Sequence, residues 1–76
     1  MKIEFSTEAE TEGSAAIVMN LFKGYTFDFH MKNGRVRTGE VMERRFHNNR
    51  PAILICQENG WEALLYVDEI VKAVYC

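Results

Sequence analysis

A short polar segment, RRFHNNR at residues 44–50, holds the side chains of this chain that are best suited to chemistry. An imidazole can stack on a nucleobase, a side-chain amide can hydrogen-bond a base edge, and a guanidinium group pairs with phosphate. Single-stranded nucleic acid is bound by this combination of stacking groups and a basic track. The candidate nucleic-acid-binding residues are therefore His47, Asn49, Arg45, Asn48, Arg50 and Arg44.

The same segment also fits a purely structural interpretation. Asparagine tolerates the left-handed backbone of tight turns, and Pro51 would fix the exit from such a turn. From the residues alone, a polar turn and a binding loop both stay open.

No other residues have the spacing of a catalytic or metal site. The two histidines, His30 and His47, lack a metal-ligand spacing with a cysteine or a carboxylate. Cys56 lies in an apolar run, where an inert core thiol is the usual form. The pair Asp68-Glu69 is typical of connector surface, and the chain has no glycine-rich phosphate loop. We therefore expect no enzyme activity, no metal and no cofactor.

The size of the chain limits it to one domain, residues 1–76. A domain this small buries only about 60–65% of its unfolded surface, so its own core stabilises it weakly. Hydrophobic residues make up 47% of the chain, and apolar surface is then left over. This favours self-association as the missing source of stability.

Charge is distributed unevenly along the chain. The net charge is −2, yet residues 23–50 hold seven basic and three acidic residues, a local balance of +4, and the remainder is −6. Such asymmetry can mark a surface for an anionic partner. A solvated hairpin face is an equally common explanation.

The cysteines and the hydropathy pattern indicate a cytoplasmic protein. Two cysteines, Cys56 and Cys76, are too few for a disulfide scaffold, so we expect free thiols in a reducing compartment. No basic stretch followed by an apolar segment opens the sequence, and no apolar run approaches the ~18 residues of a membrane span. We expect neither a signal peptide nor contact with a membrane.

The elements that must position these residues are mainly β. An Asn-Gly pair between alternating apolar segments is a strong hairpin signal, and a lone glycine inside a strand suggests a bend. Ser14 is a good N-cap for a short helix ended by Gly24, and residues 1–13 form a tail or a short extra strand. We expect strands over Tyr25–Met31, Arg35–Phe46 (bent near Gly39), Ala52–Gln57, Trp61–Val67 and Val71–Tyr75, with turns at Asn33-Gly34, His47–Arg50 and Glu58–Gly60 and a connector at Asp68–Ile70. A short helix followed by five short strands is typical of a small SH3-like barrel.

The first hairpin resembles the first motif of the Sm-like (Sm/LSm) family of RNA-binding ring proteins. That motif has alternating apolar residues, a Lys-Asp-Gly turn, a second glycine five residues on, an apolar residue, and a loop with acidic, His or aromatic, and Asn positions. The matching residues here are Phe27, Phe29 and Met31, then Lys32-Asn33-Gly34, Gly39 and Val41. The loop positions fall on Arg45, His47 and Asn49, with a basic residue, Arg45, at the acidic position of the family. Where the family has its second motif, before the last strand, this chain has Tyr66–Ile70.

The resemblance implies a five-stranded Sm-like barrel with an N-terminal helix, assembled as a cyclic homo-oligomer of identical subunits. In such rings, strand four of one subunit pairs with strand five of the next. The family pattern implies that His47 stacks on a base and that Asn49 hydrogen-bonds a base edge. The implied partner is single-stranded RNA, with DNA left open, and the implied role is RNA processing or chaperoning.

An SH3-like protein-interaction module is the alternative. Trp61, Phe46 and Tyr25 would then recognise a peptide or a partner subunit, without nucleic acid. Trp61 starts a strand and is expected in the core or at an interface. A purely structural ring component without a ligand is a third interpretation.

Overall fold

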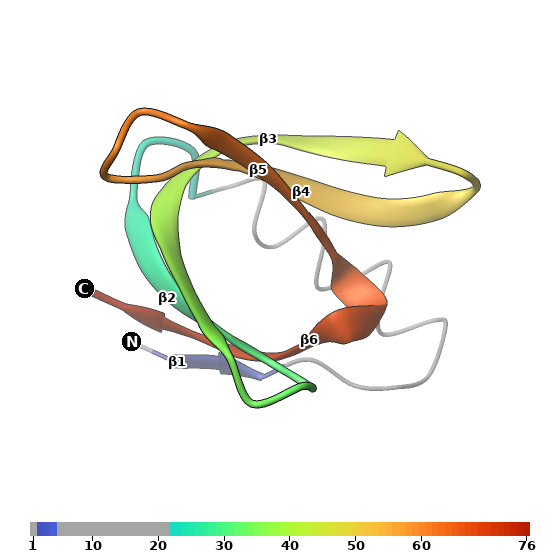
Figure 1. The fold of residues 1–76 in the computed structure, drawn as a ribbon, viewed down its shortest axis with the longest axis horizontal. Helices are drawn as coiled ribbons and strands as arrows, with labels where there is room; N and C mark the ends of the chain where they lie inside the picture. Colours follow the sequence, from blue (N-terminus) through green and yellow to red (C-terminus); the bar gives the residue numbers. More distant parts are fainter. Residues whose placement is uncertain (1, 5–21) are drawn as a thin grey trace.

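The computed structural model describes residues 2–4 and 22–76, which form one antiparallel β-sheet and a single 3-10 turn (Figure 1). The strands lie in the order β1-β6-β2-β3-β4-β5. The elements are β1 (Lys2–Glu4), β2 (Thr26–Met31), β3 (Val36–His47), β4 (Arg50–Cys56), β5 (Glu62–Tyr66), the 3-10 turn η1 (Val67–Glu69) and β6 (Ile70–Tyr75). The prediction of a mainly β fold is confirmed, and the five expected strands are present with ends shifted by a few residues.

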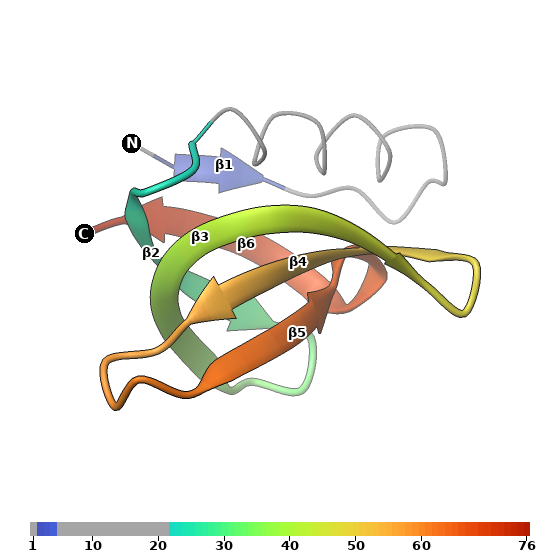
Figure 2. The same cartoon turned by 90° about the horizontal axis from the view of Figure 1, so that it is seen from above.

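The sheet is strongly curved but open. Figures 1 and 2 show it curling so that β5 and β6 lie on opposite sides of the interior, with β1 along the far edge of β6. Among the described strands, β1 and β5 are the two edges, and they do not pair with each other. The expected helix over Ser14–Gly24 falls mostly outside the described residues, and its described end at 22–24 is a turn.

The core lies on the concave side of this sheet and follows the alternation of the sequence. Phe27 and Phe29 of β2 are fully buried, whereas Thr26, the first residue of the strand, is exposed and Asp28 is partly exposed. Alternate residues of a strand face opposite sides of a sheet, which explains the pattern. Every strand from β2 to β6 and the turn η1 contribute to one buried cluster, made of Phe27, Phe29, Val41, Ile53, Ile55, Leu65, Val67, Ile70 and Ala73.

Strand β3 is shared between the two halves of the sheet. Its first part, to Glu40, pairs with β2, and its second part, from Glu40 to His47, pairs with β4. Gly39 is buried at the change of partner, and a Cβ there would lie 2.8 Å from Ile55 Cδ1 and 2.9 Å from the Cys56 carbonyl oxygen. Met42 has no partner on β4, because the register shifts between Val41 and Glu43. A missing side chain and a bulge thus bend β3 across the core.

The two Asn-Gly turns are built in the same way. At residues 31–35 and again at 57–61, the glycine N–H donates to the carbonyl three residues earlier, and the asparagine Oδ1 accepts from the N–H two residues later. Gly34 and Gly60 both have φ of +87°, a left-handed backbone that costs glycine little. These are three-residue hairpin loops with a left-handed glycine, as the sequence predicts.

The two cysteines lie too far apart for a disulfide. Cys56 ends β4 and Cys76 follows β6, and strands β2 and β3 lie between them in the sheet. Three inter-strand spacings amount to roughly 14 Å, which is beyond the Cα separation of about 4.4–6.8 Å that a disulfide spans.

Gly39→Ala should lower the free energy of unfolding by about 1–3 kcal/mol, because the added methyl group meets a backbone oxygen that has no freedom to move. Urea denaturation measures the change, with the exposed neighbour Glu40→Ala as the matched control. Equal stability of Gly39→Ala and Glu40→Ala would contradict the close approach of β3 and β4.

Candidate nucleic-acid interface

The turn between β3 and β4 consists of Asn48 and Asn49 (Figure 1, right). Their φ angles are +52° and +60°, and two positive φ values in a two-residue hairpin loop are the mark of a type I′ turn. Asparagine adopts this backbone more readily than other residues with a side chain. The structural interpretation of these asparagines is therefore correct, and it leaves both side-chain amides exposed at the end of the hairpin.

The strand register decides which of the predicted residues share a face. Arg45 lies opposite Ala52, and Ala52 lies opposite Tyr66, so the three form one row across the sheet. His47 is on the same face as Arg45, because they are two residues apart in β3. Arg44 lies opposite the buried Ile53 and so belongs to the other face. We call His47, Asn48, Asn49, Arg50, Tyr66 and Asp68 the tip cluster.

Arg50 holds the tip cluster together. Its Nε and one terminal nitrogen donate to the two carboxylate oxygens of Asp68, at 2.9 and 2.6 Å. Its Cζ also lies 3.7 Å from the centroid of the Tyr66 ring, a cation–π geometry. Glu69 is a weaker partner at 3.9 Å. A bidentate guanidinium–carboxylate pair fixes both distance and orientation, so the β3–β4 turn is fastened to the β5–β6 connection.

His47 makes a second link between the same two segments. Its Nδ1 is 2.5 Å from the Tyr66 hydroxyl, and the two ring centroids are 6.0 Å apart at an interplanar angle of 42°. In the tautomer in which Nδ1 of the neutral imidazole accepts a hydrogen bond from the Tyr66 hydroxyl, the ring carries its proton on Nε2. The Nε2 atom has no partner among the described residues, and neither amide of the turn has one. Three polar groups of the tip cluster therefore face solvent unpaired.

The arginines of the predicted site play unequal parts. Arg45 pairs with Glu43 two residues away on the same face, and Arg50 pairs with Asp68. Because Asp68 is neutralised in this way, it does not present the bare negative charge that its sequence suggests. The tip cluster is thus nearly balanced in charge, and contact with a ligand there depends more on rings and amides than on net charge.

The ion pair shifts the pKa values of both of its partners, Asp68 and Arg50. The hydrogen bond from Arg50 holds the pKa of Asp68 below its usual value, against the opposing effect of burial. The same bond raises the pKa of Arg50. Asp68 is therefore ionised, and the link is formed, throughout the physiological pH range.

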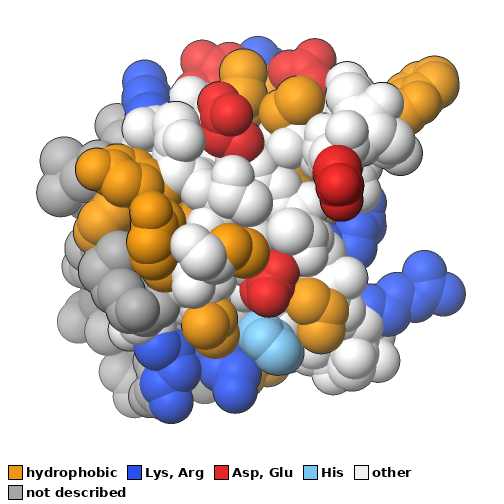
Figure 3. All heavy atoms as spheres, turned by 90° about the vertical axis from the view of Figure 1, so that its left-hand side faces the viewer, with side chains coloured by type: hydrophobic (Ala, Val, Ile, Leu, Met, Phe, Trp, Pro, Cys, Tyr) orange, Lys and Arg blue, Asp and Glu red, His pale blue; other side chains and the backbone are white. Residues whose placement is uncertain are grey.

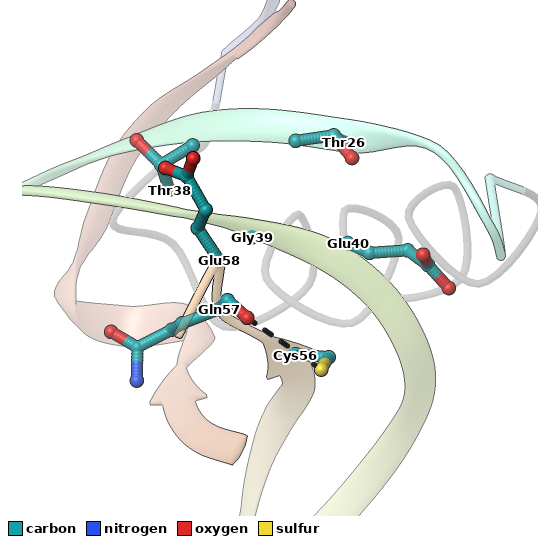
Figure 4. A pocket seen from close by; sticks show the side chains of 7 residues that line it. All are labelled: Thr26, Thr38, Gly39, Glu40, Cys56, Gln57 and Glu58. Atoms are coloured by element: carbon teal, nitrogen blue, oxygen red, sulfur yellow. Dashed lines mark hydrogen bonds between the residues drawn. The ribbon is translucent and has the colours of Figure 1, made fainter. Parts of the chain in front are cut away.

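A separate hollow of about 280 Å³ lies at the other end of β4 (Figure 4). It is lined by Thr26, Thr38, Gly39, Glu40, Cys56, Gln57 and Glu58. The only charged groups on its wall are carboxylates, which repel phosphate. Figure 3, which views the molecule from the end opposite the tip cluster, shows acidic and apolar side chains toward the middle of this end and basic side chains around its margin. This hollow is a poor match for nucleic acid.

The sequence interpretation missed Tyr66 and Asp68 as partners of the predicted loop. The signal was present in the turn Glu58–Gly60. In a hairpin centred on Asn59, two residues lie opposite each other when they are equally far from Asn59 along the chain, so their numbers sum to 118. The observed register follows this rule, from Leu54 opposite Leu64 to Ala52 opposite Tyr66. Extended by two residues, the rule sets Arg50 against Asp68.

Comparison with protein-family models, with curated proteins and with solved structures gives no significant match for this chain. The site is therefore interpreted from its own residues and geometry. Within the described parts of the chain, there is no helix of the length and apolarity required to cross a membrane.

Asp68→Asn should destabilise the fold at pH 7. Its deficit, the amount by which its free energy of unfolding is lower than that of the parent protein, should shrink as the pH falls. A carboxylate with a lowered folded pKa contributes stability above its unfolded pKa, near 4, and loses it as the pH falls through the folded value. Urea denaturation of both proteins at pH 7 and at successive lower pH values measures the deficit. Glu62→Gln, an exposed carboxylate in β5, serves as control. A deficit independent of pH would contradict the ion pair.

Proposed function

We propose that this protein is an Sm-like β-barrel that assembles into a homo-oligomeric ring and binds single-stranded RNA at the tip cluster. The strand order β6-β2-β3-β4-β5, the curvature of the sheet and the bent β3 support this assignment. The resemblance of residues 27–49 to the first Sm-like motif supports it independently.

One observation carries the proposal: the structure brings the predicted loop against the segment that occupies the place of the second family motif. Arg50 and His47 come from the first segment, and Asp68 and Tyr66 come from the second. A nucleotide site made of two segments needs both of them fixed relative to each other. Here an ion pair, a cation–π contact and a hydrogen bond fix them before any ligand arrives.

The unpaired groups of the tip cluster define how a nucleotide would bind. The imidazole of His47, held on one side by the Tyr66 hydroxyl, offers a face for base stacking and an Nε2–H for a base or phosphate oxygen. The amide of Asn49 offers a donor and an acceptor for a base edge. Because Arg45 and Arg50 are paired internally, we expect a shallow dependence of affinity on salt, compared with binders that neutralise many phosphates.

The unpaired edge of β5 supports ring assembly, whereas the outer edge of β6 carries β1 within the same chain. In the arrangement that the resemblance implies, β5 of one subunit pairs with β6 of the next. This contact is head-to-tail, so it closes only as a cyclic oligomer. Such a ring places the tip clusters of all subunits at equivalent positions around one axis, so that one RNA strand meets several of them.

The exposed aromatic residues favour a protein-interaction module as the second candidate. Trp61 is 73% exposed and Phe46 is 70% exposed. Of the two places expected for Trp61, the core is therefore excluded, and an interface stays a prediction. Phe46 lies at the tip end of the β3–β4 hairpin, whereas Trp61 directly precedes β5 at the opposite end of β4. The two rings therefore do not share one peptide groove. Light scattering that finds a monomer under all conditions would favour the module over the ring.

His47→Ala combined with Asn49→Gly should weaken the binding of oligo(U) and oligo(A) by about 5- to 150-fold, because one stacked base contributes about 1–3 kcal/mol. Glycine is chosen at position 49 because it keeps the left-handed turn while it removes the amide. Fluorescence anisotropy measures the dissociation constants.

The matched control is His30→Ala, the other histidine, which lies on β2 away from the tip cluster. The affinity of His30→Ala for oligo(U) and oligo(A) should equal that of the parent protein. Unchanged affinity of the double variant would refute the site, and equal losses in the double variant and in His30→Ala would refute its location.

A further inference from the structure

Strand β6 is paired on both of its edges within one chain. One edge pairs with β2, and the other pairs with β1, where Lys2 lies opposite Val74, Ile3 opposite Ala73 and Glu4 opposite Lys72. Figure 2 shows β1 lying alongside β6. The outer edge of β6 is the edge that a head-to-tail ring would use, so β1 occupies the place of a neighbouring subunit.

The β1–β6 pairing is the weakest strand contact in the sheet on physical grounds. It joins three residues at one end of the sequence to a strand about 70 residues away. Few backbone hydrogen bonds then oppose the entropy of closing a long loop. Edge elements with few contacts open at a much lower free energy than the core of the fold. β1 can therefore leave β6 while β2–β6 stay folded.

The edge of β5 is unusually open to strand addition. Five residues, Glu62–Tyr66, present an edge with no pairing partner among the described strands. Protected edges carry charged side chains, lysine above all, or a proline or a bulge. β5 has one charged residue, Glu62 at its first position, no lysine, no proline and a continuous register with β4. The exposed Trp61 stands directly before it. Such an edge is suited to pairing with another strand.

The edge of β6 fits β5 better than it fits β1. β6 has six residues and β5 has five, whereas β1 covers only the three residues 72–74. Apolar side chains remain exposed on both sides of the covered stretch, with Val71 at 45% and Tyr75 at 44%. A second copy that brings β5 to this edge would lengthen the ladder and cover these side chains.

We propose that β1 is an internal substitute for a neighbouring subunit: it closes the β6 edge in the monomer, and assembly exchanges it for β5 of a second copy. This inference rests on the ring of the proposed function and adds a control to it. Assembly then requires β1 to be released, so any condition that holds β1 on β6 keeps the protein monomeric. The exchange replaces a three-residue contact by a longer one and leaves the tip cluster unchanged.

A reversible crosslink tests the exchange. In a Cys56→Ala, Cys76→Ser background, Lys2→Cys with Val74→Cys places two thiols directly opposite each other on β1 and β6. Opposite residues of antiparallel strands have Cα atoms about 4.5–5.5 Å apart, which a disulfide spans. Lys2→Ser with Val74→Ser in the same background is the matched control. Light scattering gives the mass with and without reductant.

The oxidised crosslinked protein should have the mass of one chain, and the reduced protein and the serine control should be oligomeric. An oligomer of equal size in oxidised and reduced samples would overturn the exchange, while the ring itself would stand.

A second variant tests the opposite situation, in which β1 cannot pair with β6 at all. Ile3→Pro with Glu4→Pro abolishes β1 pairing, because one of two adjacent N–H groups must face β6. It should assemble at lower protein concentration than the parent. A monomer in the reduced crosslinking variant, the serine control and the proline variant alike would overturn both the exchange and the ring.

Discussion

The whole structure depends on the bend in β3. A strand that pairs with β2 along its first part and with β4 along its second part must change direction between them, and this happens where Gly39 approaches Ile55 and the carbonyl of Cys56. The unpaired Met42 adds a bulge just beyond. Because of this bend, one sheet can surround a core of nine buried residues. The same bend carries the second part of β3 out past the core and sets the β3–β4 turn beside the β5–β6 connection.

Residues of the tip cluster that form the turn are also those of the proposed site. The asparagines are needed for a backbone with two positive φ angles, and that backbone turns their amides toward solvent. Arg50 and Asp68 compensate each other, so their contribution is to position Tyr66 and His47 rather than to attract phosphate. A charge-balanced, pre-positioned surface would gain affinity from stacking and base-edge contacts, and a single-stranded nucleic acid offers both. Repetition around a ring would multiply a modest affinity per subunit.

Much of the fold was readable from the sequence, because its signals are local. Alternation in 27–31, the Asn-Gly turns and the strand glycine each act within a few residues, and all of them appear as expected. The partners of the predicted loop were harder to predict from the sequence, because Arg50 and Asp68 are 18 residues apart and are brought together only by the register of the β4–β5 hairpin. The openness of the sheet and the pairing of β1 with β6 depend on the balance of weak edge contacts, which no local pattern encodes. The sequence likewise left the core and an interface open for Trp61, and the structure excludes the core, because Trp61 precedes β5 and its side chain is exposed.

The central claim, that the tip cluster is where RNA binds, is tested most directly by mapping backbone amide shifts in a TROSY titration with oligo(U). The account predicts that the shifts concentrate in residues 46–50 and 66–69, the two segments joined by Arg50 and Asp68. Shifts confined to residues 38–40 and 57–61, around the acidic hollow at the far end of β4, would contradict it.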